Sequence, residues 1–534
     1  MREVELTPSS LGLVRGGFKD ITEDGLKAVG ISERYYIKRI LARPQLSIPT
    51  SATAASQQQG RLPHQTTQPV ALESDRILDP RPGSAVASSE PEDSHLMEQV
   101  VAEKDIKQIV SLLGAKGGTS RDVAVIGCKG LDELCDKDDR NRVSVRQNGG
   151  LETLVALLNV YLVGEGDEKV IASVLGAVWK LSRNADNKIR LGECGGCDAV
   201  VHALTEFGKT SEKVAEMGCG AVLNLAANNH ENKKRLGGCG GCEAVVKALE
   251  SFGETNEKVA YRGCGAVWNL AANNHENKKR LGGFEGCRAV VKALEKFGKT
   301  SEGVARSGCG AVWNLTFNNA DNTKRLSGYG GCEAVVNALE RFGVTNEKVA
   351  ERGCEAVWNL AFNNADNTKR LSGYGGCEAV VNALERFGVT NEKVAGRGCE
   401  AVWNLAFNNA DNTKRLVDCG GCEAVVKALE SFGDKNEEVA REGCGAVMNL
   451  ASDDDTTKRL VGCGGCEAVV KALKSFGETN EKVALRGCGA VNNLAANNAD
   501  NKKRLVNKLN AIEIVLKCRD NSNKAGCLSV LRSW

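Results

Sequence analysis

The chain contains 534 residues, with 70 Lys and Arg against 68 Asp and Glu, 22 Cys and only 4% aromatic residues. A single compact domain rarely exceeds about 300 residues, so this length indicates several domains or an elongated array. The near-neutral charge excludes a general polyanion binder, and we expect no specific nucleic acid partner.

The sequence shows no targeting or membrane signal. No apolar run reaches the ~18 residues of a membrane span, so we expect none. The opening sequence, MREVELTPSS, lacks the basic segment and apolar core of a secretory signal. We therefore expect a cytoplasmic protein, with a nuclear location left open, whose Cys side chains stay reduced.

Residues 17–45, GFKDITEDGLKAVGISERYYIKRILARPQ, form the first recognisable segment. Their Ile-Thr-Glu-Asp-Gly-Leu opening, the Gly30-Ile31 pair and the Ile37–Leu41 helix resemble the second half of a sterile alpha motif domain. We assign residues 1–42 to this partial helical segment. The resemblance implies a second protein-binding surface, through which the chain would self-associate.

A region rich in Pro, Ser and Gln follows. All eight Pro residues lie at or before Pro91, and seven of them fall between Pro44 and Pro91. Such a composition buries too little apolar surface to offset the entropy of ordering, which predicts a disordered linker over residues 43–97. No Pro occurs from residue 98 onward, which favours helix after helix.

An internal repeat fills the rest of the chain. A segment that begins at Gly196 has close copies whose matching Cys residues are Cys242, Cys287, Cys332, Cys377, Cys422 and Cys466. The copies are 45 residues apart, except for a last step of 44, and degenerate copies at both ends bring the total to about ten. A fixed period of this length is typical of a helical solenoid, in which each unit buries its apolar face against its neighbours.

One unit, residues 231–274, predicts three helices. ENKKRLGG is a short first helix that ends at its Gly pair, and CEAVVKALESF is a second helix that ends before Gly253. The third helix runs from about Glu257 to Asn273, with Thr255 or Asn256 as its N-cap.

The succession of ENKKRL, GGCEAVVKAL and EKVA…AVWNLA is similar to the armadillo repeat, over about residues 105–534. The resemblance implies an all-α fold, a right-handed superhelical armadillo-type solenoid of about ten repeats with a period of 45. We assign it to residues 98–534, behind the disordered linker. It also implies an inner groove, lined by the third helices, that holds extended segments of partner proteins.

The Asn of each Asn-Leu pair is the main candidate for partner binding. Its side chain has a donor and an acceptor, so it can pair with the C=O and N–H of one extended peptide unit. Helices stack about 8–10 Å apart and an extended chain advances ~3.3 Å per residue, so each unit would meet every third residue. The alternative is that the Asn only ties one helix to the next. The seven candidates are Asn224, Asn269, Asn314, Asn359, Asn404, Asn449 and Asn493.

Trp directly precedes this Asn in four units, at Trp268, Trp313, Trp358 and Trp403. These indoles either flank the groove or pack beneath the next unit. In the importin alpha class, Trp instead lies four residues before the Asn, where this chain has Gly or Glu. Our main prediction is a non-enzymatic protein–protein interaction scaffold. The alternative is a nuclear transport adaptor, which this difference in Trp position disfavours.

The position eight residues before the Asn varies most between units that are otherwise nearly identical. Two helical turns place it on the Asn face, so it is either plain surface or contacts a partner's side chains. Nearby Glu355 and Glu400 would, with Glu351, suit a basic or mixed peptide. The specificity candidates are Glu216, Tyr261, Arg306, Glu351 and Arg441.

Four CGGC sequences resemble zinc or redox motifs. In intervening units the first Cys is replaced by Phe284, Tyr329 or Tyr374, which fits an apolar contact rather than a zinc ligand. We therefore expect buried thiols, no metal and no cofactor. No catalytic constellation recurs, so we expect no enzyme. The basic NKKRL and NTKRL runs are interpreted as a solvated rim.

Overall fold

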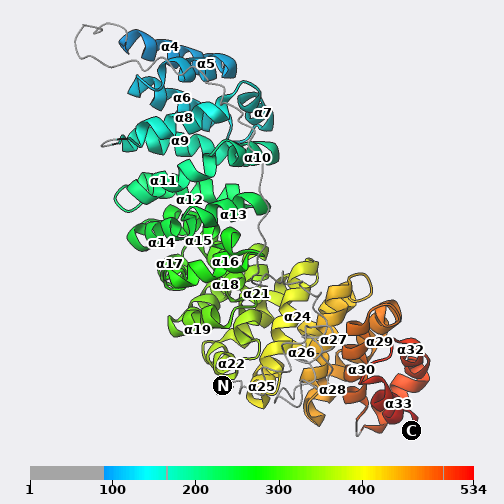
Figure 1. The fold of residues 1–534 in the computed structure, drawn as a ribbon. Helices are drawn as coiled ribbons and strands as arrows, with labels where there is room; N and C mark the ends of the chain where they lie inside the picture. Colours follow the sequence, from blue (N-terminus) through cyan, green and yellow to red (C-terminus); the bar gives the residue numbers. More distant parts are fainter. Residues whose placement is uncertain (1–89, 164–165, 497, 534) are drawn as a thin grey trace, which may run out of the picture. The chain divides into compact units, whose positions relative to one another are not determined.

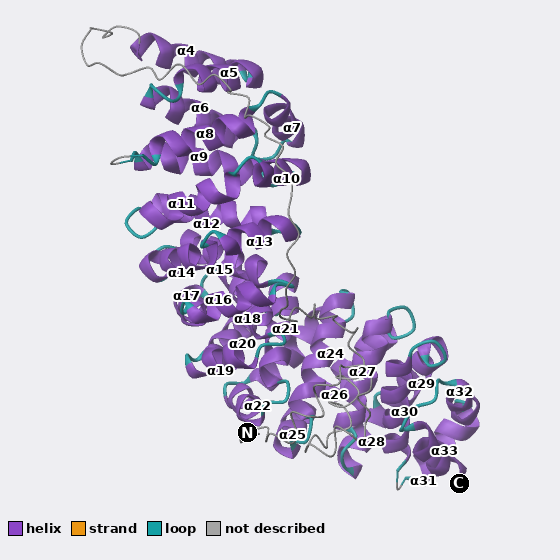
Figure 2. Cartoon of the chain, in the orientation of Figure 1, coloured by secondary structure: helices purple, strands orange, loops and turns teal. Residues whose placement is uncertain are grey.

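A computed structural model describes residues 90–163, 166–496 and 498–533 of the chain. Every regular element within these ranges is helical, with thirty α-helices, one π-helical turn and no strand (Figure 2). The all-α prediction is confirmed. The predicted sterile alpha motif-like segment, residues 1–42, and residues 43–89 of the predicted linker lie outside the described residues.

Helix α4 (Glu90–Glu103) corrects the predicted end of the linker. The first turn of a helix tolerates Pro91, because the N–H that proline lacks would have no intrahelical partner there. Met97 and Val100 are buried. Residues from Glu90 onward therefore belong to the helical array rather than to a linker that reaches residue 97.

The helices group into units of three, which follow one another in chain order along the array (Figure 1). The first helices are α4, α7 (Asp139–Gln147), α10 (Ala185–Glu193), α13 (His230–Gly238), α16 (His275–Gly283), α19 (Ala320–Gly328), α22 (Ala365–Gly373), α25 (Ala410–Asp418), α28 (Asp454–Gly462) and α31 (Ala499–Lys503), the last continued by the π turn η2 (Arg504–Lys508). The second helices are α5 (Ile106–Lys116), α8 (Gly150–Tyr161), α11 (Gly196–Phe207), α14 (Gly241–Phe252), α17 (Gly286–Phe297), α20 (Gly331–Phe342), α23 (Gly376–Phe387), α26 (Gly421–Phe432), α29 (Gly465–Phe476) and α32 (Ala511–Lys517). The third helices are α6 (Arg121–Leu134), α9 (Glu168–Leu181), α12 (Glu212–Ala226), α15 (Glu257–Ala271), α18 (Glu302–Thr316), α21 (Glu347–Ala361), α24 (Glu392–Ala406), α27 (Glu437–Leu450), α30 (Glu481–Ala495) and α33 (Lys524–Arg532). The prediction of about ten repeats is confirmed.

Paired Asn residues separate one unit from the next. After α15, Asn273 adopts the left-handed conformation with φ 52°, which Asn tolerates better than most residues. Asn274 then caps α16, because its side chain accepts a hydrogen bond from the N–H of Asn277. Between the first and second helices, Gly240 has φ 94°. This glycine, and not the Gly pair inside α13, therefore turns the chain.

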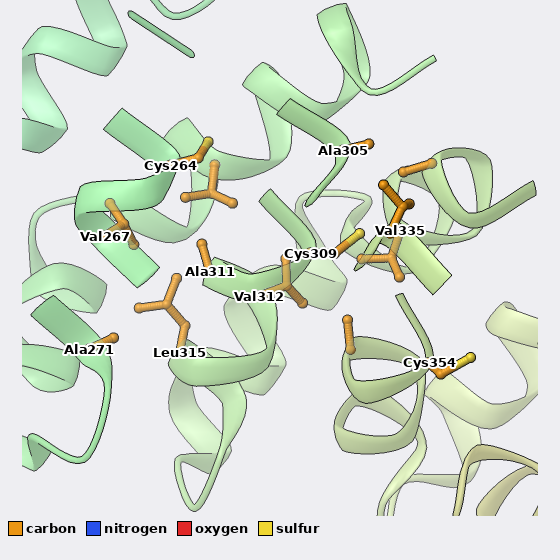
Figure 3. Close-up of a cluster of buried hydrophobic side chains, with 14 of the residues drawn as sticks. Cys264, Val267, Ala271, Ala305, Cys309, Ala311, Val312, Leu315, Val335 and Cys354 are labelled. Atoms are coloured by element: carbon orange, nitrogen blue, oxygen red, sulfur yellow. The ribbon is translucent and has the colours of Figure 1, made fainter. Parts of the chain in front are cut away.

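The third helices form the centre of the array, because each packs against the third helix of the next unit. Figure 3 shows part of this core, with Ala311 and Leu315 of α18 between Cys264 and Val267 of α15 on one side and Cys354 of α21 on the other. All five side chains are fully buried. Small side chains such as Ala and Cys let the helices approach closely.

Polar side chains repeat the same contacts from unit to unit. The N-cap Asn346 of α21 donates through Nδ2 to Glu302 Oε2 at 2.9 Å, at the start of the preceding third helix. In the first helices, Asn277 Nδ2 donates to Lys233 O at 3.0 Å. Each bond joins residues 44 positions apart, so these bonds fix the register between successive units.

The basic runs are only in part a solvated rim. Lys233 and Lys278 are buried, and their Nζ atoms donate to the carbonyls of Ala272 and Phe317, each at 2.7 Å. Burial lowers the pKa of Lys278 to about 8. The Lys that follows each of them is exposed, as expected. The first Lys of each of these two runs therefore has a structural role that the sequence did not reveal.

Candidate partner-binding surface

The seven predicted Asn side chains lie at one position near the end of successive third helices. In six of them, Nδ2 donates a hydrogen bond to a main-chain carbonyl in the preceding third helix. The pairs are Asn224 with Trp179, Asn269 with Leu223, Asn314 with Trp268, Asn359 with Trp313, Asn449 with Trp403 and Asn493 with Met448, at 2.8–3.0 Å. The Asn row therefore joins each unit to the one before it.

These bonds have a physical cause at the helix ends. The last four carbonyls of an α-helix have no intrahelical N–H partner. Each acceptor belongs to such a last turn, as Trp268 does in α15, which ends at Ala271. The Asn donor is thus used inside the protein, which corrects the prediction that the side chain pairs with both the C=O and the N–H of a bound peptide.

The acceptor atoms of the Asn row remain available. Oδ1 of Asn493 accepts a hydrogen bond from Asn492. In the described residues, no group donates a hydrogen bond to the other six Oδ1 atoms. None of these six atoms is fully enclosed. Each oxygen is thus an unused acceptor. Asn224, Asn269 and Asn449 are half-exposed, whereas Asn314, Asn359 and Asn404 are only 7–9% exposed.

Asn404 departs from the row. Its Nδ2 donates to the carbonyl of Glu400, one turn earlier in its own helix α24, at 2.9 Å. Among the described residues, the carbonyl of Trp358 therefore accepts only from the N–H of Phe362, at 2.9 Å, whereas that of Trp313 accepts from both Phe317 and Asn359. The row of Asn side-chain hydrogen bonds between units is therefore interrupted between α21 and α24.

The four predicted Trp side chains are half-buried. Trp268 lies against Gly310 of the next unit, where a Cβ would come within 2.7 Å of the indole. The guanidinium of Arg486, from the second unit after that of Trp403, lies 3.7 Å from the ring centre of Trp403. Both contacts favour the packing role over a fully open groove position.

The same packing explains why several units of this chain have Gly at the position that Trp occupies in the importin alpha class. A Cβ on Gly220 would lie 3.1 Å from the Trp179 ring, and one on Gly489 would lie 2.4 Å from Met448 Sδ. The Gly residues therefore make room for a side chain of the preceding unit. Side chains of the array itself therefore fill the space that a row of Trp side chains occupies in that class.

The specificity candidates have partners inside the protein. Glu216 is 5% exposed and pairs with Arg262 of the next unit at 2.8 Å. Glu351 is 3% exposed and pairs with Arg352 at 3.0 Å. Contrary to expectation, neither carboxylate is open to a partner's side chain, because each is buried in an ion pair with a neighbouring guanidinium.

The other three candidates are half-exposed. Tyr261 Oη accepts a hydrogen bond from Arg306 Nη2 of the next unit at 3.1 Å. Arg441 Nε donates to Glu442 Oε1 at 2.5 Å. These three side chains are partly accessible, so they stay candidates for contact with a partner.

Buried charges form a network across α21, α24 and α27. Arg397 lies at its centre, 3.1 Å from Glu355, 3.0 Å from Glu400 and 2.8 Å from Glu438. Burial and then the charge of Glu442 raise the pKa of Glu400 to about 8. Glu355 and Glu400 therefore serve this internal network and are not the open acidic sites that we expected.

The cysteines are free thiols, and all but four of the 22 are buried. Burial raises the pKa of Cys309 to about 12. Among the described residues, no group of three or more His, Cys, Asp or Glu side chains is arranged to hold a metal ion. The aromatic residues in the first Cys slot, Phe284, Tyr329 and Tyr374, are 37–47% exposed, so this slot lies at the surface rather than in the core.

Burial predicts a sharp division in thiol reactivity, because the thiolate is the reactive form. In the native protein at about pH 8, the half-buried Cys194, Cys239, Cys419 and Cys463 should react first with an aromatic disulfide reagent, because the reagent can reach them, although burial raises the pKa of the last three to about 11. All 22 should react after denaturation. Spectrophotometric counting of the released thiolate measures both numbers, and rapid release from most thiols of the native protein would contradict the described burial.

One hollow is separate from the Asn row. It has a volume of about 540 Å³ and is lined by residues that include Val155, Asn159, Asp198 and His202. None of its lining residues belongs to a third helix. It therefore does not coincide with the surface that the sequence predicted.

The sequence analysis missed three Phe residues, Phe317, Phe362 and Phe407, which directly follow the third helices of consecutive units. Phe407 is 51% exposed, and the other two are half-buried. The sequence signal was the residue before the Asn pair, which is Phe in the FNNAD of these three units and Ala in the units that have AANN.

Stacked units of one short and two longer helices, joined through their third helices and an Asn row, define an armadillo-like helical-repeat solenoid. No family model matches the chain. Over 100 residues, or 18% of its length, the chain is 33% identical to Catenin delta-2 of Homo sapiens and of Mus musculus. The chain spans only 8% of these relatives. The crystal structure of an engineered protein covers 80% of this chain and 99% of its own, with 25% identity and a TM-score of 0.63.

Proposed function

We propose that the chain is a non-enzymatic protein-interaction scaffold that binds extended segments of partner proteins along its third helices. The observation that carries the proposal is the row of Asn side chains, one per unit on successive third helices, in which six of the seven Oδ1 atoms accept no hydrogen bond from a described residue. The armadillo-like fold and the partial likeness to Catenin delta-2 support a scaffold role. No described helix is both long and apolar enough to cross a membrane.

The geometry favours one hydrogen bond per unit. Stacked helices lie about 8–10 Å apart, and an extended chain covers that distance in about three residues. An Asn whose Nδ2 is held by the preceding helix presents its Oδ1 in a fixed direction. Such a row would accept every third N–H of a partner segment, and main-chain recognition of this kind leaves the choice of partner to neighbouring side chains.

The test compares affinity capture from cell extract by the full chain and by a variant with Asn314→Ala and Asn359→Ala. Partners that depend on the Asn row should be lost from the variant. Each substitution also removes a structural hydrogen bond, which contributes about 1 kcal/mol. A control must therefore lose the same kind of bond elsewhere.

The matched control carries Asn232→Ala and Asn277→Ala. These side chains also donate to carbonyls of the preceding unit, at 2.8 and 3.0 Å, but they are 2% exposed. The control should keep its partners. If both variants lose the same partners, or neither loses any, the Asn row does not bind them. The alternative function, a nuclear transport adaptor, stays a prediction that no observation favours over the scaffold.

A further inference from the structure

Three consecutive units differ from the rest at the turn that follows the third helix. This turn holds Phe317, Phe362 and Phe407, whereas the equivalent residues of other units include Ala227, Ala272 and Ala496. The Phe side chains follow the Asn of their unit by three positions, which places them near the Asn face of the helix.

The fold does not require Phe at this turn. Phe317 has φ −59° and ψ 112°, and Ala272 has φ −61° and ψ 118°, so both residue types adopt the same backbone conformation. An exposed aromatic ring gives little stability to the folded chain, and exposed apolar patches often mark interaction sites. Phe407, which is 51% exposed, is therefore better explained by contact with a partner, and Phe317 and Phe362 are half-buried at the equivalent positions.

Aromatic contacts join two of these three units. The ring of Phe317 lies 6.3 Å from Trp358 of the next unit, and Trp358 lies 6.5 Å from Phe362. In the same three units, the enclosed Nε1 atoms of Trp313, Trp358 and Trp403 have no acceptor among the described residues. An unpaired enclosed N–H is unfavourable, so these three indoles are not fully satisfied within the folded chain.

Negative charge lies beside the Phe residues. Asp321, Asp366 and Asp411 each follow a Phe by four residues, at the start of the next first helix. All three are exposed, and no ion pair in the described part of the chain involves them. The equivalent Glu276 pairs with Arg280, but Glu231 and Asp500, in units with Ala at the turn, also form no ion pair among the described residues, so only the Phe residues distinguish these three units.

We propose that Phe317, Phe362, Phe407, Asp321, Asp366 and Asp411 form an aromatic–acidic strip that selects the partner. Its occupant is an extended protein segment whose large apolar side chains recur at about every third residue, with Lys or Arg between them. The apolar side chains contact the Phe and Trp rings, and the basic side chains pair with the Asp carboxylates. This inference rests on the proposed function, because the Asn row would hold the main chain of the same segment.

The test uses the full chain and labelled synthetic peptides of about 15 residues, long enough to cross roughly five units at ~3.3 Å per residue. The repeating triplets are Leu-Lys-Ser, Leu-Glu-Ser and Ala-Lys-Ser. Fluorescence anisotropy should show the tightest binding for Leu-Lys-Ser. Relative to it, loss of the apolar or basic component should weaken binding by at least about tenfold.

Two variants separate the components of the strip. Changing all three Phe residues to Ala gives the residue found in other units, so the fold should persist, and binding of the Leu-Lys-Ser peptide should fall at least about tenfold. Changing all three Asp residues to Asn should weaken binding mainly at low salt. Circular dichroism of both variants should match that of the unaltered chain.

The proposal is overturned if the unaltered chain does not bind the Leu-Lys-Ser peptide, if it prefers the Leu-Glu-Ser peptide, or if the Phe variant binds as tightly as the unaltered chain. Self-association that disappears in the Phe variant would assign the strip to a second copy and would also overturn it. Binding that depends on Asn314 and Asn359 but not on the Phe residues would leave the proposed function intact while removing this inference.

Discussion

Replacing Arg397 with Ala should lower the free energy of unfolding by about 3–5 kcal/mol, which is the usual result of removing one partner from a buried ion pair. Arg397 contacts three carboxylates, those of Glu355, Glu400 and Glu438. Glu355 and Glu400 are only 2% and 5% exposed. Without the guanidinium, these two acids would remain close together in a site that water barely reaches.

Urea unfolding and hydrogen exchange of α24 measure the effect, and exchange is needed because repeat arrays open locally. The control adds Glu355→Gly and Glu400→Gly to Arg397→Ala. Gly occupies the equivalent position in other units, at Gly310 and Gly445. The triple variant should recover most of the lost stability. Equal instability in both variants would show that Arg397 acts through packing rather than charge.

Replacing Glu400 with Gln should stabilise the protein above pH 8 by several kcal/mol, since each unit of pKa shift corresponds to ~1.4 kcal/mol. The pKa of Glu400 is raised to about 8 in the fold, from an ordinary value of 4.5. Between these values the folded state binds one more proton than the unfolded state. Stability therefore falls as pH rises from 4.5 to 8 and then levels off.

Gln resembles the protonated carboxyl, so Glu400→Gln should match the unaltered chain near pH 4.5 and exceed it at pH 8. Urea midpoints measured across this range provide the comparison. Glu355→Gln is the matched variant from the preceding, nearly identical unit. Burial also raises the pKa of Glu355, but Arg352 and Arg397 both oppose the rise, so its effect should be smaller. A midpoint difference that is constant with pH would contradict titration of Glu400.

Local signals were sufficient to predict the helices of each unit. Helix α14 (Gly241–Phe252) was expected from the spacing of its apolar residues and from Gly253, and Asn256 caps α15 as predicted. The start of the array was predicted less well. The Pro-rich composition around Pro91 obscured a helix whose first turn accepts proline without losing a hydrogen bond.

The sequence also placed the Asn row on one face of the third helices, but it did not show where each amide points. Asn314 donates to a carbonyl of Trp268, 46 residues away. A helical period identifies the face of a residue, whereas a hydrogen bond depends on atoms supplied by the neighbouring unit. The same limit applied to Glu355, which appeared open until the guanidinium of Arg397 was placed beside it.

The sequence alone therefore determined the repeat period, the three helices of each unit and caps such as Asn256, because these depend on contacts between residues near one another in the chain. Only the tertiary structure decided which polar side chains are used between units and which remain for a partner. That division depends on stacking, which brings residues about one period apart within hydrogen-bond distance and excludes water from some of them but not from others.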